Sequence, residues 1–162
     1  MQPEARYLIG VAGCGKSTYC DGLLKSHPEM NYHIVSSDTI IEANARAWNM
    51  TYFQAIMTMK EEDTHDRLLL PLMNAVKNKR NILIDRTNMG KWSRYFTMRY
   101  ITDDYLRIGV VFNVSMDNIK FRLRRREFLT GKHIPESVVE RMYKNFQFPD
   151  GREFHKIEMI YS

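Results

Sequence analysis

Short apolar runs alternate along this chain with longer stretches in which apolar positions recur every three or four residues. The short runs contain β-branched and aromatic residues and lack regular polar alternation, which is typical of strands buried on both faces of a parallel sheet. They predict strands at residues 7–9, 32–36, 81–85, 106–114 and 156–161.

The longer stretches predict helices that connect these strands. His27 and Pro28 end the first helix, and Pro135 opens the last one. The predicted helices cover residues 15–27, 38–48, about 51–79, 91–100, 115–128 and the segment after Pro135, where Val138, Met142 and Phe146 fall on one side. We expect a break near residues 49–51 and a kink or split at Pro71. Strands that alternate with helices predict an α/β fold with a parallel sheet of four to five strands.

Size and composition fit one domain over residues 1–162. No apolar run reaches 18 residues and the first residues lack a signal-peptide pattern, so we expect a cytoplasmic protein that does not enter a membrane. Cys14 and Cys20 are expected to be free thiols. The net charge of +5 either is a chance surplus or attracts a polyanion, and clustering of the basic residues has to distinguish the two.

Residues 10–18 read Gly-Val-Ala-Gly-Cys-Gly-Lys-Ser-Thr and match the full P-loop pattern, between a predicted strand and a predicted helix. Glycines let successive amides point inward at phosphate oxygens, and the helix N-terminus adds partial positive charge. A coincidental Gly-rich turn is the alternative, which the order of strand, loop and helix disfavours. We therefore expect ATP and Mg²⁺ to bind here, with Lys16 on the β- and γ-phosphates and Ser17 on the metal. The predicted nucleotide contacts are Gly10, Ala12, Gly13, Cys14, Gly15, Lys16, Ser17 and Thr18.

Two aspartates follow predicted strands, at the sheet edge where parallel α/β proteins place their chemistry. Asp38 comes after residues 32–36, and Asp85 ends residues 81–85. A carboxylate near a γ-phosphate can accept the proton of an attacking hydroxyl or hold magnesium. We assign Asp38 as the general base and Asp85 to the metal or the substrate. The alternatives are a helix N-cap for Asp38 and a turn residue for Asp85.

Four arginines cluster at positions 122, 124, 125 and 126. On a helix, Arg122, Arg125 and Arg126 share a side, where their charges repel one another unless an anion lies between them. The segment then runs into a loop with Gly131, so residues 122–134 resemble a lid that closes over a transferred phosphate. A solvated basic face or a general RNA-binding patch is the alternative. Together with the phosphate loop, this predicts a P-loop NTPase three-layer sandwich with a helical lid.

Large apolar residues also gather between positions 48 and 59. They recur at helical spacing, so we interpret them as core residues rather than as a platform for base stacking. The set consists of Trp48, Met50, Tyr52, Phe53, Met57 and Met59.

The chain resembles bacteriophage-type polynucleotide 5′-hydroxyl kinases over residues 5–150. Four stretches carry the resemblance: the phosphate loop, Ser36-Ser37-Asp38, Asp85-Arg86-Thr87-Asn88 followed by Arg94, and the arginine-rich lid with Val138–Lys144 after it. The resemblance implies that Asp38 activates the acceptor hydroxyl and that Lys16 binds the donor phosphates. It implies that an arginine of the lid, best matched by Arg126 with Arg122 beside it, contacts the same phosphates.

Where the family carries an arginine for the acceptor phosphate, this chain has Ile41, and Arg46 or Arg86 could replace it. The resemblance implies that residues 85–88 contact substrate, with either Asp85 or Arg86 in the family's acidic position. It implies an ATP-dependent kinase of RNA or DNA 5′-hydroxyl ends, in a host cytoplasm if a phage encodes it. A small-molecule kinase for a nucleoside, a nucleoside monophosphate or a sugar is the alternative. A third reading, a nucleotide-dependent binding module, is disfavoured by Asp38.

Overall fold

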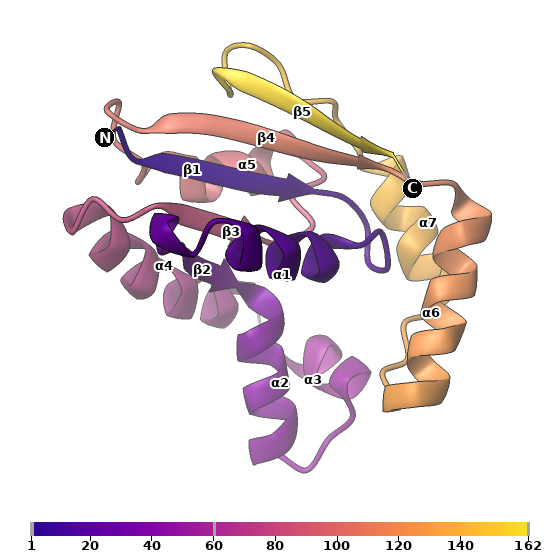
Figure 1. Cartoon of the computed structure of the whole chain (residues 1–162). Coiled ribbons are helices and arrows are strands. Elements are labelled where there is room, and N and C mark those ends of the chain that lie inside the picture. Colours follow the sequence, from indigo (N-terminus) through magenta and orange to yellow (C-terminus); the bar gives the residue numbers. More distant parts are fainter. Residues whose placement is uncertain (1, 60, 162) are drawn as a thin grey trace.

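A sheet of five parallel strands forms the centre of the computed structural model, which describes residues 2–59 and 61–161, without the side chains of residues 61–65. The strands are β1 (Glu4–Ile9), β2 (His33–Ser36), β3 (Ile82–Asp85), β4 (Leu106–Asn113) and β5 (Lys156–Tyr161). Their order across the sheet is β2-β3-β1-β4-β5, and all arrowheads point to the same edge (Figure 1). The predicted α/β fold is confirmed.

Helices cover both faces of this sheet (Figure 1). They are α1 (Lys16–Ser26), the 3₁₀ turn η1 (Pro28–Met30), α2 (Ser37–Ala47), α3 (Tyr52–Thr58), α4 (Glu61–Lys77), α5 (Lys91–Met98), α6 (Met116–Thr130) and α7 (Glu136–Lys144). Side chains alternate along each strand, so Tyr7 and Ile9 pack with α4 and the segment after α5, whereas Leu8 packs with α1 and α6. The result is a three-layer sandwich.

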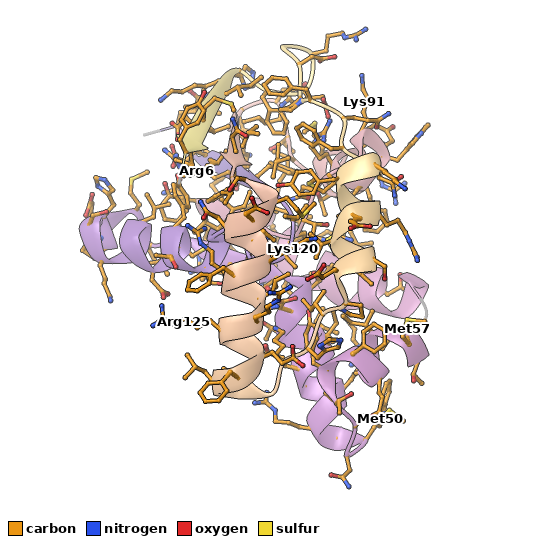
Figure 2. All side chains as sticks on the ribbon, turned by 90° about the vertical axis from the view of Figure 1, so that its right-hand side faces the viewer. Arg6, Met50, Met57, Lys91, Lys120 and Arg125 are labelled. Carbon is orange, nitrogen blue, oxygen red and sulfur yellow. The ribbon has the colours of Figure 1, made fainter. Side chains whose placement is uncertain are left out.

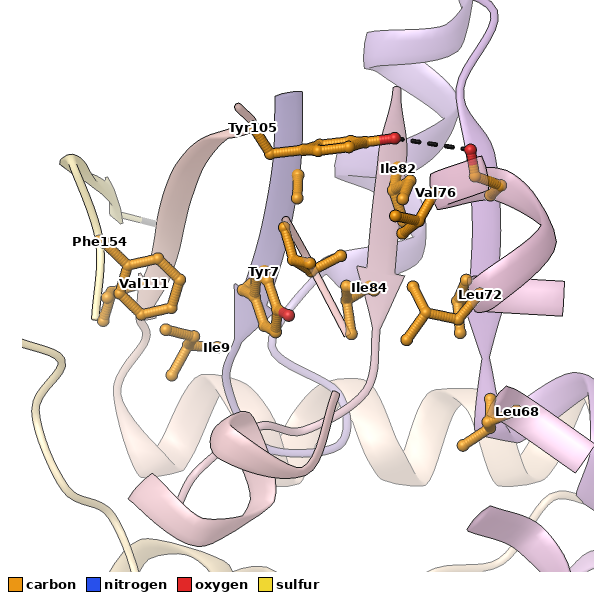
Figure 3. Close-up of a cluster of buried hydrophobic side chains, with 14 residues drawn as sticks. Tyr7, Ile9, Leu68, Leu72, Val76, Ile82, Ile84, Tyr105, Val111 and Phe154 are labelled. Carbon is orange, nitrogen blue, oxygen red and sulfur yellow. Dashed lines mark hydrogen bonds between the residues drawn. The ribbon is translucent and has the colours of Figure 1, made fainter. Parts of the chain in front are cut away.

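The face covered by α4 forms a continuous apolar core (Figure 3). Leu68 and Leu72 of α4 lie against Ile82 and Ile84 of β3, and all four side chains are at most 2% exposed. Burying each such side chain stabilises the fold by roughly 1.5–3 kcal/mol. This layer fixes β3, and with it Asp85, between β2 and β1 in the sheet.

Two boundaries differ from the sequence prediction. Strand β1 begins at Glu4, earlier than expected, because Glu4 and Arg6 neutralise each other within the sheet: Arg6 Nε lies 2.6 Å from a Glu4 oxygen, and Tyr32 donates to the same carboxylate. The segment 51–79 divides near Met59 into α3 and α4, whereas α4 runs through Pro71 without being split. The two helices pack differently: α3 lies against α2, whereas α4 lies against the sheet.

A buried ion pair fastens the loop after β3 to the C-terminal part of the chain. Arg94 of α5 is 0% exposed, and its Nε lies 2.7 Å from a carboxylate oxygen of Glu153. The same guanidinium donates to the carbonyls of Asn88, Met89 and Gln147. Arg94, one of the residues that carry the family resemblance, therefore braces the loop that follows Asp85.

We expect Arg94→Met to lower the free energy of unfolding by about 3–5 kcal/mol, because the buried Glu153 carboxylate would lose its cation and three carbonyls would lose a donor. Urea denaturation measures this. Lys79→Met is a suitable control, since Lys79 pairs with Asp104 at the surface and its loss should cost less than about 1 kcal/mol. Equal effects of the two substitutions would contradict the bracing role.

Candidate active site

The phosphate loop joins β1 to α1 and depends on glycine backbone geometry. Gly13 and Gly15 have φ values of 82° and 107°, in the left-handed region that glycine tolerates best. A Cβ on Gly10 would lie 2.5 Å from the Cys14 sulfur, so this position also has no room for a side chain. The Lys16 ammonium donates to the carbonyls of Gly10 and Val11 at 3.0 and 2.9 Å, at the mouth of the loop.

A cavity of about 850 Å³ opens beside this loop. Three groups of residues line it: the phosphate-loop residues 12–19, the strand-end residues Ser37, Asp38, Asp85, Arg86 and Thr87, and side chains from helices α3, α6 and α7. The carboxyl ends of β2 and β3 and the lid, residues 122–134, therefore face the same cavity. Gly10 does not line the cavity; its amide donates to the Thr87 carbonyl at 2.9 Å and ties the phosphate loop to the loop after β3.

Asp38 lies in the first turn of α2, and both oxygens of its carboxylate accept hydrogen bonds. Tyr52 of α3 donates to Oδ1, and the Lys132 ammonium donates to Oδ2 at 3.2 Å. The N-cap position belongs to Ser36, so Asp38 does not cap the helix. Burial alone would raise the pKa of Asp38, but the Tyr52 hydroxyl and the Lys132 and Lys16 charges outweigh it and lower that pKa. The group is therefore held as a carboxylate facing the cavity.

Asp85 has the opposite electrostatic setting. Its pKa is raised, first by burial and also by the nearby Asp38 charge, although Lys16 and a hydrogen bond with Ser36 act in the other direction. A bound cation would relieve this cost. Within the described residues, no three acidic, histidine or cysteine side chains converge on a metal position. Ser17 and Asp85, both lining the cavity, fit Mg²⁺, which typically binds through one or two protein oxygens together with phosphates and water.

The loop after β3 divides its residues between the cavity and the scaffold. Arg86 and Thr87 line the cavity, as their predicted substrate role requires. Asn88 does not: it is 0% exposed, has a φ of 50°, and its amide donates to the carbonyls of Leu8 and Ile84. The expected substrate contact at Asn88 is thus replaced by a clamp between β1 and β3. Of the two candidates to replace an arginine at Ile41, Arg86 lies at the cavity and Arg46 is not among its lining residues.

The arginine-rich helix α6 presents its cations as the three- and four-residue spacing predicts. Arg122, Arg125 and Arg126 line the cavity, whereas Arg124 points outward to Glu136 at 3.0 Å. Arg122 also donates to the Cys14 carbonyl of the phosphate loop at 3.2 Å. Two buried nitrogens of Arg126, Nε and Nη2, have no hydrogen-bond partner among the described residues. This makes Arg126 the lid arginine best prepared for an anionic ligand.

The lid reaches across the cavity and contacts α2, the helix that carries Asp38. Gly131 ends α6 with a φ of 69°, and the next residue, Lys132, is held between α2 and α3. Its ammonium lies 2.9 Å from a Glu42 oxygen and 3.8 Å from the centre of the Tyr52 ring, in addition to the bond with Asp38. His133 also packs edge-on against Phe53, with ring centres 6.4 Å apart. Lys132 is therefore a site residue that the sequence interpretation missed.

Helix α3 forms a further wall of the cavity, although its large apolar residues were predicted to belong to the core. Tyr52, Phe53, Ile56 and Met57 line the cavity, and the Met57 side chain is 70% exposed (Figure 2). Trp48 and Met50 are also exposed, at 44% and 38%. The core interpretation was wrong for these positions because α3 lies beyond the sheet, against α2 and the lid. Helical spacing alone does not reveal which neighbour a helix faces.

A family model described as AAA domain matches residues 6–149 of this sequence. The chain belongs to the AAA domain family. Its match includes the phosphate loop, both strand-end aspartates and the lid. Among the described residues of this AAA domain, no helix has both the length and the apolar character that crossing a membrane requires.

Curated relatives of this AAA domain include heterogeneous nuclear ribonucleoprotein U-like protein 2 from Mus musculus, which is 23% identical over 159 residues. They also include L-seryl-tRNA(Sec) kinase from Methanococcus maripaludis, which is 24% identical over 143 residues. The alignments cover 91% and 88% of this chain but only 20% and 52% of those proteins. The chain thus spans a fifth to about half of the length of these relatives.

Solved structures with the same fold come from different kinds of protein. A gluconokinase from Sinorhizobium meliloti 1021 superposes with a TM-score of 0.59 and 12% identity, covering 99% of this chain and 83% of that one. A chain of the Pnkp1/Rnl/Hen1 RNA repair complex superposes with a TM-score of 0.68 and 22% identity, covering 88% and 43%. At these identities the comparisons show the P-loop kinase fold and do not identify the substrate.

We expect Lys132→Met to raise the pKa of Asp38, because the substitution removes a positive charge and one hydrogen-bond donor from its carboxylate. Side-chain carboxyl carbon shifts followed by NMR over a pH titration measure this directly. If Asp38 has to be ionised for turnover, the acid limb of the pH–rate profile moves to higher pH in the same variant.

Lys120→Met provides the matched control, since Lys120 bridges α6 to Glu136 at 2.9 Å and does not line the cavity. Its Asp38 titration should coincide with that of the unmodified protein. Coincident titrations for Lys132→Met as well would show that the lid lysine does not act on Asp38.

Proposed function

We propose that this protein is an ATP-dependent polynucleotide kinase that transfers the γ-phosphate to a 5′-hydroxyl end of RNA or DNA. One observation carries the proposal: the Asp38 carboxylate is kept ionised in the same cavity as the phosphate loop. A hydroxyl that enters this cavity would meet a base on one side and a phosphate cradle on the other. A binding module without phosphoryl transfer has no need of such a base.

The transfer itself follows from this placement. Asp38 accepts the proton of the acceptor hydroxyl while the oxygen of that hydroxyl forms a bond to the γ-phosphorus. The bond from that phosphorus to the bridging oxygen breaks, and ADP leaves with the electron pair. Lys16, Arg122 and Arg126 would hold the phosphates and balance the charge that develops on them. Magnesium at Ser17 and Asp85 would supply further charge compensation when bound.

The charges of the cavity favour a polyanionic ligand set. Six basic side chains and two carboxylates line it: Lys16, Arg86, Arg122, Arg125, Arg126 and Arg141 against Asp38 and Asp85. The surplus of positive side chains exceeds the net negative charge of a nucleoside triphosphate with one bound magnesium ion. Arg86, next to Asp85, is the cation we assign to the acceptor phosphate in place of an arginine at position 41. Clustering of basic residues at the cavity thus favours the polyanion interpretation of the net charge.

The acceptor end of the cavity favours a nucleotide over a sugar. Phe53, Ile56 and Met57 of α3 and Leu129 of the lid present apolar surfaces there. Such surfaces pack well against the flat face of a nucleobase and provide no hydrogen bonds for a polyhydroxy acceptor. The names of two similar proteins, an RNA repair complex and a tRNA-linked kinase, agree with a nucleic acid acceptor. Ile41 is the observation that favours a small-molecule acceptor instead.

A panel of acceptors with labelled ATP tests the proposal. We expect label on the 5′ ends of RNA or DNA oligonucleotides with a free 5′-hydroxyl, and none on the same oligonucleotides that already carry a 5′-phosphate. Transfer confined to a free nucleoside or to a sugar such as gluconate would establish the small-molecule alternative. Absence of transfer to every acceptor, with ATP bound, would overturn the kinase assignment.

We expect Asp38→Asn to lower kcat by a factor of about 10²–10⁴, since an amide cannot accept the proton, with ATP affinity changed only a few-fold. Rapid-mixing kinetics and ATP titration measure the two quantities separately. An unchanged kcat would remove Asp38 from the chemistry.

Lys16→Ala should weaken ATP binding and abolish transfer, while urea denaturation shows the fold intact, because among the described residues Lys16 bonds only to loop carbonyls and the Cys14 sulfur. ATP affinity is the deciding measurement. Full activity in this variant would refute the phosphate-cradle assignment.

A further inference from the structure

Helix α5 carries a row of exposed aromatic side chains outside the cavity. Trp92 is 81% exposed and Tyr95 is 53% exposed, and their rings meet edge to face with centres 5.8 Å apart. With Arg99, which follows the helix, they occupy positions i, i+3 and i+7 and form one stripe. The buried residues Arg94 and Thr97 lie on the opposite side of the same helix. The stripe is therefore the outward face of α5.

This outward face is both aromatic and basic. Residues 86–100 contain the four cations Arg86, Lys91, Arg94 and Arg99 and no acidic residue. Glu153 neutralises the buried Arg94, and Asp150 lies 3.6 Å from the Lys91 ammonium. Arg99 is exposed and stacks over the rings of Phe96 and Tyr100, 5.1 and 4.9 Å from their centres. An exposed indole and an exposed guanidinium two turns further along the same face offer a π-face for a base and a charge for a phosphate.

The stripe begins close to the cavity wall along the chain. Thr87 lines the cavity, and Trp92 follows it by five residues, so the two lie at most about 18 Å apart even if the chain between them is fully extended. The start of α5 also contacts the segment that follows α7, because the Lys91 amide donates to the Gln147 side chain at 2.7 Å. In Figure 2 Lys91 accordingly lies beside α7, whose Val138 and Arg141 line the cavity.

We infer that α5 is the docking surface for the strand downstream of the phosphorylated end, a single-stranded nucleic acid whose bases stack on Trp92 and Tyr95 and whose backbone meets Arg99. The inference rests on the proposed function for the identity of the strand. The first nucleotide occupies the cavity, the strand passes the loop 86–90, and the stripe engages nucleotides a few positions further along. Lys91 is paired with Asp150 and Arg94 with Glu153, so the exposed Arg99 is the cation of this stripe that matches the negative charge of such a strand. The same stripe on a second copy of the chain carries the same positive charge and therefore does not complement it.

Substrate length gives the sharpest kinetic test. For an oligonucleotide of about eight residues with a 5′-hydroxyl, Trp92→Ala should lower kcat/KM about tenfold, the effect of losing one stacked base. For a dinucleotide, which cannot reach α5, the same variant should match the unmodified protein. Trp92→Phe retains a ring and should restore part of the loss. Because Trp92 is exposed, these substitutions leave the packed core intact.

Trp48→Ala is the matched control, since Trp48 is the other tryptophan of the chain, is 44% exposed and does not line the cavity. It should leave kcat/KM unchanged for both acceptors. An equal loss on the eight-residue strand and the dinucleotide in Trp92→Ala, or no loss on either, would overturn the inference.

A binding measurement separates this surface from the chemistry. In a Trp48→Phe background, Trp92 is the single tryptophan, and its fluorescence should be quenched as the eight-residue strand is added, with weaker binding at higher salt. If the protein phosphorylates no strand, the proposed function fails, and this titration then decides the surface alone. Emission that is unaffected by the strand but changes with protein concentration would identify the stripe as a contact between copies and overturn the inference.

Discussion

Parallel backbone pairing around β3 is the constraint on which the whole site depends. In the ladder, Asp85 lies opposite Leu8 of β1 and Ser36 of β2. The phosphate loop begins two residues after Leu8, and Asp38 follows two residues after Ser36. The strands β1, β2 and β3, which are far apart in the sequence, therefore end side by side at the carboxyl-terminal edge of the sheet. A shift of register by a single residue would turn Asp85 to the other face and separate these groups.

Much of this arrangement was accessible from the sequence because its signals are local. The phosphate loop is a fixed spacing of glycines and Lys16, and the strand before Asp85 is an uninterrupted apolar run. The spacing of Arg122, Arg125 and Arg126 likewise placed them on one side of a helix. Each of these inferences needs only the neighbours of a residue along the chain, and each agrees with the observed placement.

What the sequence did not reveal depends on contacts between distant segments. Lys132 looks like an ordinary loop lysine until the lid is placed against α2, 94 residues earlier. Tyr52 and Phe53 have the spacing of core residues, and only the position of α3 beyond the sheet turns them towards the cavity. Asn88 was expected to contact substrate, and Arg94 belongs to the same stretch of family resemblance, yet both are buried and donate to backbone carbonyls. Residue type and spacing cannot distinguish a polar group that binds a ligand from one that supports the loop beside it.

The contact between the lid and the phosphate loop restricts how the lid can move. Leu123 of α6 fills the space where a side chain on Gly13 would lie, at 3.0 Å, and Arg122 is bonded to the same loop. The root of α6 is thus anchored at the phosphate loop, whereas the helix ends further along at Gly131, whose φ of 69° is left-handed. Under the proposed function, a swing at Gly131 would leave Arg122 at the nucleotide, while Lys132 would move with the residues after the helix and uncover Asp38 for the acceptor hydroxyl.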